Sequence, residues 1–118
     1  MNEKQKKRFE FWKSSSEEIR RIVDEFAGKL KENHVEYDSL VLFGSYAKGN
    51  FRKDSDVDIA VISSHFGKNR LFERINLMKI SSKVDARIEP HPVSLKDWKE
   101  GWKQIIYEIN RTGVKIPA

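Results

Sequence analysis

The chain has 118 residues, a formal net charge of +5 and 35% charged residues. This length predicts one domain over residues 1–118, and the basic balance favours an anionic partner: a nucleotide, a nucleic acid or an acidic protein surface. The absence of cysteine excludes disulfides, zinc-thiolate sites and thiol nucleophiles, and no apolar run is long enough to span a bilayer, so we expect a cytoplasmic protein without membrane association.

A polar N-terminal lead-in over residues 1–13 precedes the first predicted helix. It mixes basic and aromatic residues and is typical of a frayed helical extension more than of a nucleic-acid-binding arm. The segment Ser14–Ser16 offers N-caps, and Asn33 is a plausible stop. Between them, apolar residues recur at helical spacing and predict one buried face: Ile19, Ile22, Val23, Phe26 and Leu30.

Two short strands flank a turn of small residues. The run Ser39–Phe43 is continuously apolar after its first residue, which predicts a strand buried on both faces. Gly44 and Ser45 follow it, and a loop over residues 48–55 leads into a second strand over residues 57–62. The short connection predicts a hairpin-like pair.

The second half of the chain predicts two helices and one more strand. Residues 69–82 read as a helix whose core contacts are Leu71, Phe72, Ile75, Leu77 and Met78. Residues 83–89 alternate strictly between apolar and charged, which predicts a strand that the two prolines at 90 and 92 terminate. A last helix begins after Ser94 and presents one apolar face: Trp98, Trp102, Ile105, Ile106 and Ile109. Gly113 is its expected C-cap, and residues 114–118 could add an edge strand.

Carboxylates and small residues meet around the turn. Asp56 and Asp58 lie two residues apart at the start of a strand, so their side chains share one face. Two ionised carboxylates at such a distance repel each other, and a divalent cation between them relieves the repulsion. Gly44 and Ser45 offer backbone N–H groups that suit a phosphate. The stretch therefore predicts nucleotide chemistry.

Other candidate groups carry less information. Asp85, Arg87 and Glu89 share one face of the predicted strand over residues 83–89, which makes that face either solvent-exposed or the wall of a site. The three histidines have no ligand spacing to one another, so structural or surface roles are favoured for all of them.

The pattern Gly44-Ser45, ten further residues, then Asp56-Val57-Asp58 resembles the signature of the polymerase-β-like nucleotidyltransferase superfamily. The fuller run through Ala47, Gly49 and Ser55 is similar to its minimal nucleotidyltransferase (MNT) branch. The resemblance covers most of the chain. The order of the predicted elements gives a small mixed sheet with helices packed mainly on one face and the other face open for a ligand, and the resemblance implies the α+β nucleotidyltransferase fold.

The resemblance also implies roles for individual residues. Asp56 and Asp58 would hold two Mg²⁺ ions, and a third carboxylate on a neighbouring strand would complete the metal site and serve as a catalytic group. Asp85 is the preferred third carboxylate because Glu89 lies beside Pro90 at the predicted strand end. Phosphates of the donor, ATP, would be bound by Gly44 and Ser45, with two further candidates in Lys48 and Arg52.

Minimal members of this family commonly act as antitoxins that transfer AMP to a tyrosine of a HEPN-domain toxin. The resemblance thus implies a hetero-oligomeric complex with a HEPN-domain protein. Two alternatives remain: nucleotide transfer to a small hydroxyl compound such as an aminoglycoside, and a non-catalytic module that neutralises a toxin by binding it. Nucleic-acid binding depends on charge alone and is not favoured.

Overall fold

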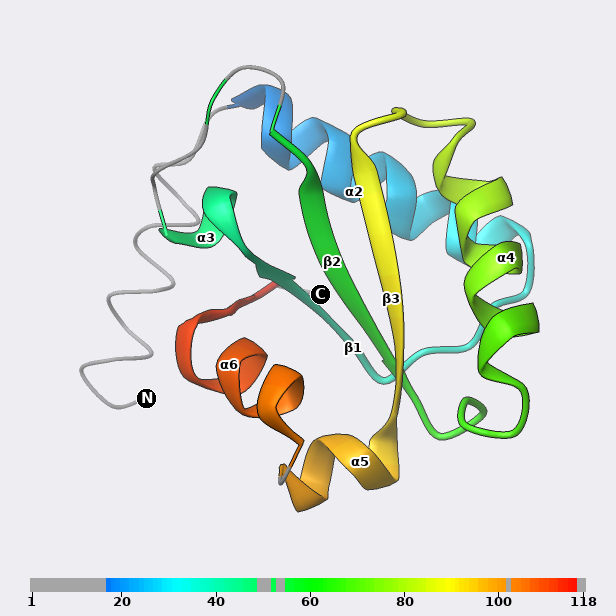
Figure 1. Cartoon of the computed structure of the whole chain (residues 1–118). Coiled ribbons are helices and arrows are strands. Elements are labelled where there is room, and N and C mark those ends of the chain that lie inside the picture. Colours follow the sequence, from blue (N-terminus) through cyan, green and yellow to red (C-terminus); the bar gives the residue numbers. More distant parts are fainter. Residues whose placement is uncertain (1–16, 49–51, 53–54, 102, 117–118) are drawn as a thin grey trace.

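The computed structural model describes residues 17–48, 52, 55–101 and 103–116 (Figure 1). The lead-in over residues 1–13, the N-cap serines and Trp102 lie outside these residues. The elements are, in order, α2 (Glu17–Glu32), β1 (Ser39–Phe43), α3 (Ser45–Lys48), β2 (Val57–Ser63), α4 (Arg70–Ser81), β3 (Ile88–Ser94), α5 (Leu95–Glu100), α6 (Gln104–Thr112) and β4 (Val114–Lys115). None of these helices is both long enough and apolar enough to cross a membrane.

The four strands form one mixed sheet in the order β3-β2-β1-β4. β1 pairs antiparallel with β2 and with β4, whereas β2 and β3 run parallel. The predicted hairpin-like pair and the edge strand at the C-terminus are both confirmed. In this topology β1 ends at the same edge of the sheet at which β2 and β3 begin (Figure 1).

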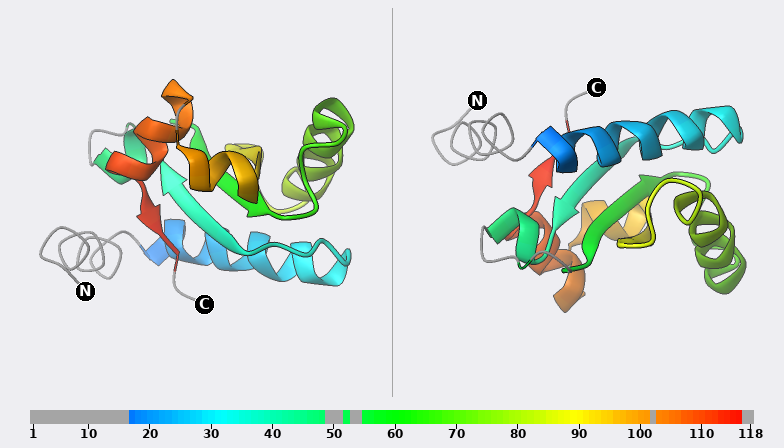
Figure 2. Two further views of the ribbon diagram at one scale, coloured as in Figure 1. Left: turned by 90° about the horizontal axis from the view of Figure 1, so that it is seen from below. Right: turned by 90° about the horizontal axis from the view of Figure 1, so that it is seen from above.

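Apolar side chains cover both faces of the sheet. One face packs on α2 and on the inner side of α4, through Leu42, Ile59, Ile88 and their neighbours. The opposite face packs on α6, and a smaller set of residues forms its core: Val41, Ala60, Ile62, Val93, Ile106 and Ile109. Figure 2 shows α2 on one side of the sheet and α5 with α6 on the other. The α+β class and the mixed sheet are confirmed, but helices cover part of both faces.

Helix α2 forms as its sequence predicts. Its five apolar residues are all buried, and each contributes roughly 1.5–3 kcal/mol of hydrophobic stabilisation. The helix ends where the Asn33 side chain donates a hydrogen bond to the Lys29 carbonyl at 2.8 Å and where His34 adopts a positive φ of 59°. The apolar periodicity alone was sufficient to predict the buried residues of α2, because a single face of this helix meets the sheet.

The prediction for the third strand is wrong. β3 spans Ile88–Ser94, so Pro90 and Pro92 lie inside it, and Asp85 lies in the turn that precedes it. β3 is an edge strand with β2 as its one neighbour in the sheet. Every second N–H of such a strand points away from its neighbour, and proline at those positions removes no ladder hydrogen bond. The alternation of side chains between the two faces of the strand continues through the prolines, and Ile88 and Pro90 are both buried.

The predicted C-terminal helix is divided in two. Gly101 caps α5 in the left-handed region at φ 64°, and its N–H donates to the Asp97 carbonyl. The predicted start is confirmed, since Ser94 accepts a hydrogen bond from the Asp97 N–H at 3.1 Å. α6 then begins at Gln104 and ends at Gly113, whose N–H donates to the Ile109 carbonyl. The predicted apolar face continues across the break, because Trp98 packs against the core that contains Ile106 and Ile109.

Four of the five core residues expected on α4 are exposed. Leu77 is buried, as is Ile80, but the exposed fractions of Leu71 and Phe72 are 70% and 66%. At 3.6 residues per turn the exposed apolar side chains lie roughly opposite the buried ones. We call the exposed set the α4 outer face, and it consists of Leu71, Phe72, Ile75 and Met78. Helix α4 therefore has two apolar faces, and the sheet covers one of them.

Two glycines provide a test of this packing. A Cβ atom at Gly113 would overlap the Ile109 carbonyl oxygen and would lie 2.5 Å from Cγ1 of Val41, whereas a Cβ at Gly28, on the exposed side of α2, would meet nothing within 4 Å. Gly113→Ala should lower the free energy of unfolding by about 1–3 kcal/mol. Gly28→Ala should raise it by about 0.5–1 kcal/mol, because alanine is the better helix former. Urea denaturation of both variants measures the difference, and equal effects of the two changes would contradict the packing of α6 on β1.

Candidate functional site

Polar side chains collect at the edge of the sheet where β1 ends and β2 and β3 begin. Residues of β2 and β3 alternate between the two faces, and the face that α6 covers further along carries Asp58, Glu89 and His91 at this edge. In the parallel register Asp58 lies opposite Glu89, and Ala60 lies opposite His91. The same face thus changes from polar to apolar within two residues.

These three side chains lie close enough to bind one ion. One donor atom from each of Asp58, Glu89 and His91 lies within 4.8 Å of the other two. His91 Nε2 is 3.2 Å from Asp58 Oδ1, and the His91 ring meets the Phe43 ring edge-on at 5.0 Å between centroids. The side chains are partly exposed, at 22% for Asp58, 39% for Glu89 and 20% for His91. Solvent and ligands can therefore reach the donors.

Gly44 is required for this arrangement. It has a positive φ of 75°, and a Cβ atom at this position would overlap Oδ2 of Asp58. The approach follows from the strand pairing, in which Phe43 lies opposite Asp58. A side chain at position 44 would both strain the backbone and displace the carboxylate. This is a physical reason for the glycine in the Gly44-Ser45 pair.

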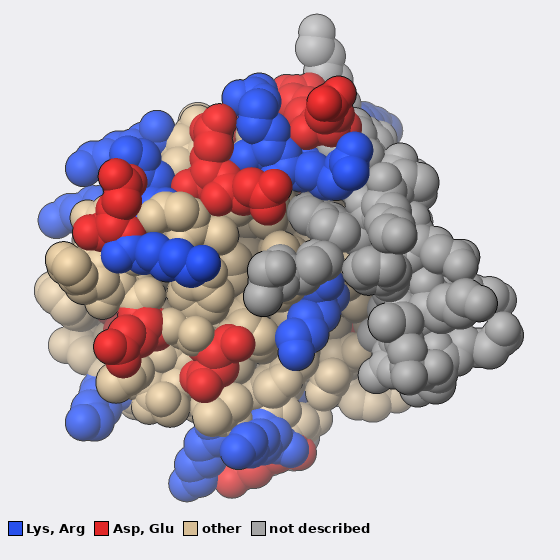
Figure 3. All heavy atoms as spheres, turned by 180° about the vertical axis from the view of Figure 1, so that it is seen from behind, with Lys and Arg blue, Asp and Glu red and all other residues tan. Residues whose placement is uncertain are grey.

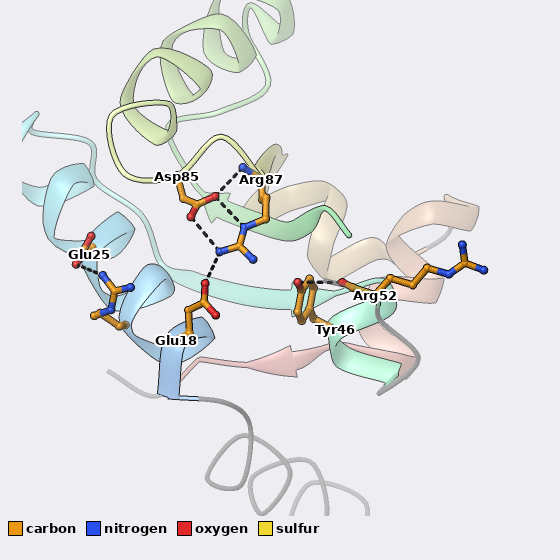
Figure 4. A network of polar contacts seen from close by, with 7 residues as sticks. Glu18, Glu25, Tyr46, Arg52, Asp85 and Arg87 are labelled. Carbon is orange, nitrogen blue, oxygen red and sulfur yellow. Dashed lines mark hydrogen bonds and ion pairs between the residues drawn. The ribbon is translucent and has the colours of Figure 1, made fainter. Parts of the chain in front are cut away.

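The turn after Gly44 folds into the single helical turn α3. Tyr46 is buried, and its hydroxyl donates to the Arg52 carbonyl at 3.4 Å. The Arg52 N–H donates to Ser55 Oγ at 2.7 Å, and the Ser55 N–H donates back to the Arg52 carbonyl at 3.0 Å. Ser45 begins α3 directly beside Gly44. The Arg52 side chain extends away from Tyr46 (Figure 4), and the side chain of Lys48 lies outside the described residues.

Asp56 lies just before β2 and is exposed. It is two residues from Asp58, as expected from the sequence, but it is not a member of the group formed by Asp58, Glu89 and His91. The strand begins at Val57, one residue after Asp56. Asp56 therefore lies next to the end of β2 that carries Asp58, outside the group of three donors.

Asp85 belongs to a different network of contacts (Figure 4). Its carboxylate accepts hydrogen bonds from the backbone N–H of Arg87 at 2.8 Å and from Arg87 Nε at 3.1 Å. Arg87 also donates to Glu18 of α2 at 2.8 Å. The Arg87 guanidinium lowers the pKa of Asp85, and the two carboxylates raise the pKa of Arg87. Asp85 and Arg87 thus connect the turn before β3 to α2, whereas Glu89 lies beside Asp58.

Basic residues of α4 and α6 lie near the site. Arg74 contacts Glu89 at 3.2 Å and thereby connects α4 to the carboxylate group. Arg70 and Lys103 both contact Asp97 at 3.0 Å, and the hydrogen bond from Lys103 lowers the pKa of Asp97. A hollow of about 210 Å³ adjoins His91 between α4, β3 and α6. Seen from behind, on the side that α2 covers, basic and acidic side chains are interspersed (Figure 3).

The donor set fits a divalent cation. Carboxylate oxygens are the ligands that Mg²⁺ and Mn²⁺ prefer, and an imidazole nitrogen adds a donor that transition metals accept. Asp58 and Glu89 face one basic side chain, Arg74, and one histidine. A bound cation would reduce the repulsion between the two carboxylates.

Two residues of this group were not ranked first by the sequence analysis. Glu89 was the second choice because Pro90 was expected to end the strand, and His91 was expected to be structural because no other histidine has ligand spacing to it. The signal that could have found both is the alternation of Ile88, Pro90 and Pro92 with Glu89 and His91, which is the period of a strand.

Comparisons of sequence identify relatives. The family model described as Polymerase beta, Nucleotidyltransferase matches residues 25–117. A protein of Methanocaldococcus jannaschii named "Putative protein adenylyltransferase MJ1305" is 34% identical over 88 residues, which cover 66% of this chain and 60% of that protein. A second protein of that organism, "Putative protein adenylyltransferase MJ0141", is 28% identical over 102 residues, which cover 84% of this chain and 99% of that protein. The match thus spans about three fifths of the length of the first relative and nearly all of the second.

A solved structure has the same fold. The crystal structure of "a putative nucleotidyltransferase from Sulfolobus solfataricus" superposes with a TM-score of 0.56 at 17% identity. The superposition covers 75% of this chain and 83% of that one. At 17% sequence identity, the similarity concerns only the arrangement of helices and strands.

The Asp85 network makes a prediction about stability. Asp85→Asn should lower the free energy of unfolding at pH 7 by about 1–2 kcal/mol, because it removes a charge-assisted pair with Arg87. The folded-state pKa of Asp85 lies below its ordinary value of 3.8, so the contribution is complete above that value and is lost as the pH falls through the lowered pKa. Denaturation from pH 7 to pH 3 should show the two proteins converging. Asp24→Asn, an exposed carboxylate of α2, is the matched control, and an equal loss in that variant would contradict the structural role of Asp85.

Proposed function

This chain belongs to the polymerase-β nucleotidyltransferase family, and we propose that it transfers AMP from ATP to a hydroxyl group of a protein, with a divalent cation such as Mg²⁺ as cofactor. The observation that carries the proposal is the approach of Asp58 and Glu89 beside the Gly44 turn. Both relatives from Methanocaldococcus jannaschii are named "Putative protein adenylyltransferase", which supports a protein as the acceptor.

Different residues would bind the cation and the donor phosphates. Asp58 and Glu89 would hold the cation, with Asp56 as a ligand of a second one. Gly44 and Ser45 would bind phosphate oxygens of the donor through backbone N–H groups at the start of α3. When bound, the cation supplies charge neutralisation for the phosphates and lowers the pKa of a coordinated hydroxyl. Asp85 has no part in this assignment because Arg87 and the turn hold it elsewhere.

The transfer itself is a substitution at phosphorus. The acceptor hydroxyl gives its proton to water, and its oxygen forms a bond to the α-phosphorus of ATP. The bond from that phosphorus to the bridging oxygen of the β-phosphate breaks, and pyrophosphate leaves. The chain contributes by positioning these oxygens and by stabilising the charge that develops on the leaving group.

The α4 outer face supports a protein partner. Its exposed apolar area is on the order of 400 Å², similar to the largest patch on a typical monomer, and such patches often serve binding. The helix borders the site, since Arg74 on its side contacts Glu89. A protein bound to this face would therefore lie next to the cation-binding carboxylates.

The charges around the α4 outer face indicate the character of the partner. Residues 68–83 contain five basic residues and one acidic residue. A second copy of this chain would bring the same basic residues together, which is unfavourable, whereas an apolar surface with acidic residues around it is complementary. We propose that the partner is a HEPN-domain toxin, with a tyrosine as the acceptor.

The transfer reaction can be tested with three matched variants. The protein is incubated with ATP, Mg²⁺ or Mn²⁺, and a candidate HEPN-domain protein, and AMP addition is followed by intact-protein mass spectrometry. Asp58→Asn and Glu89→Gln should each reduce the rate by about 100-fold or more, because each removes a charged cation ligand. Asp85→Asn makes the same chemical change outside the site and should retain activity within a few-fold.

Other results would change the proposal. Loss of transfer in Asp85→Asn with activity retained in Glu89→Gln would restore Asp85 as the third carboxylate. Binding of the toxin by the wild-type protein without AMP addition would favour the non-catalytic antitoxin.

The docking role of α4 has its own test. Ile75→Asp and Leu71→Asp should weaken the complex with the HEPN-domain protein by at least about thirty-fold, because each buries a charge in the apolar interface. Both residues are exposed, so the thermal midpoint of the free protein should stay nearly unchanged. Tyr107→Asp alters an exposed aromatic residue on α6 and serves as the control. Isothermal titration calorimetry measures the affinities, and equal weakening by all three changes would contradict docking on α4.

A further inference from the structure

His91 lies beside Asp58 and Glu89, within the distance at which the three side chains could share one cation. β3 extends through both prolines, and its alternation places Glu89 and His91 on the same face as Asp58. The edge-on contact with Phe43 holds the imidazole ring beside the carboxylates. The imidazole of His91 is thus positioned by the register of β3 against β2 and by its packing on Phe43.

The distances between the donor atoms fit a shared ion. Two ligands about 2.1–2.2 Å from one ion in neighbouring positions lie roughly 3 Å apart. His91 Nε2 and Asp58 Oδ1 are 3.2 Å apart, and the third donor, on Glu89, lies within 4.8 Å of both.

We infer that His91 is a nitrogen ligand of the cation held by Asp58 and Glu89, and that it makes the site select Mn²⁺ or another first-row transition ion over Mg²⁺. The inference rests on the proposed function in one respect: it takes the two carboxylates to be cation ligands. It goes beyond that function because it concerns which metal the site binds. Three oxygen ligands would suit Mg²⁺, whereas an imidazole nitrogen in place of one of them favours a transition metal ion.

The selectivity follows from ligand chemistry. Mg²⁺ binds oxygen donors, demands regular octahedral geometry and retains several waters. Mn²⁺ accepts carboxylates equally well, and the later transition ions bind imidazole more tightly still. A site with two carboxylates and one imidazole therefore gains affinity for these ions from His91, and gains little for Mg²⁺.

The inference is tested by metal binding to the full chain without nucleotide or acceptor. Free Mn²⁺ is measured by electron paramagnetic resonance during a titration, and Mg²⁺ is added in competition. Wild-type protein should bind Mn²⁺ at least about ten-fold more tightly than Mg²⁺. Pulsed resonance of the bound Mn²⁺ should show coupling to an imidazole ¹⁴N nucleus.

Two histidine variants separate a ligand from a positioning residue. In His91→Gln the side-chain amide can still donate a hydrogen bond to Asp58 but offers no imidazole nitrogen, so the ¹⁴N coupling should vanish and Mn²⁺ affinity should fall about ten-fold, with Mg²⁺ affinity changed less than about three-fold. His65→Gln is the control, because His65 contacts Glu36 on the surface at 2.8 Å. The His65→Gln variant should retain both the ¹⁴N coupling and the preference for Mn²⁺ over Mg²⁺.

Several results would overturn the inference. They are a wild-type protein that binds no Mn²⁺ or shows no ¹⁴N coupling, a preference for Mg²⁺, and a His91→Gln variant that keeps wild-type Mn²⁺ affinity. The wild-type spectrum alone decides the question if His91→Gln does not fold. Failure of AMP transfer while the ¹⁴N coupling is present would refute the proposed function and leave the ligand assignment intact.

Discussion

The close approach of Gly44 to Asp58 is the contact on which the site depends. The antiparallel pairing of β1 and β2 sets Phe43 opposite Asp58, and the next residue must turn away with a positive φ while leaving space for the carboxylate. Glycine meets both conditions. The same turn begins α3, so one backbone feature positions the Asp58 carboxylate and starts the helical turn beside it. In the proposed function, phosphate binding and cation binding would thus have a common structural origin.

The second constraint is the register of β3 against β2. Because the strands are parallel and in step, Asp58 and Glu89 emerge at the same edge on the same face, and His91 follows two residues later. Beyond this edge the face becomes apolar and is packed under α6. The site is therefore the uncovered end of a core face. The strands that hold its donors are stabilised by burial a few residues away.

Local patterns predicted most of the fold. α2, β1 and β2 follow from their periodicity and length, and the glycine turn with its aspartates indicated the nucleotide chemistry. What failed depended on tertiary context. Prolines ended the predicted third strand because its edge position was unknown, and that error favoured Asp85 over Glu89. The α4 outer face was assigned to the core because periodicity does not reveal which of two apolar faces meets the sheet. The sequence predicted one helix across Gly101, where the structure has α5 and α6, because the apolar pattern continues on both sides of this glycine.

The central claim is that the carboxylates of Asp58 and Glu89 bind the catalytic cation. The most direct measurement is anomalous diffraction from crystals of the protein grown with Mn²⁺ and a non-hydrolysable ATP analogue. We predict an anomalous peak within bonding distance of Asp58 and Glu89, with the analogue's phosphates toward Gly44. A peak bound by Asp85 instead, or no peak beside Asp58 at saturating Mn²⁺, would contradict the account.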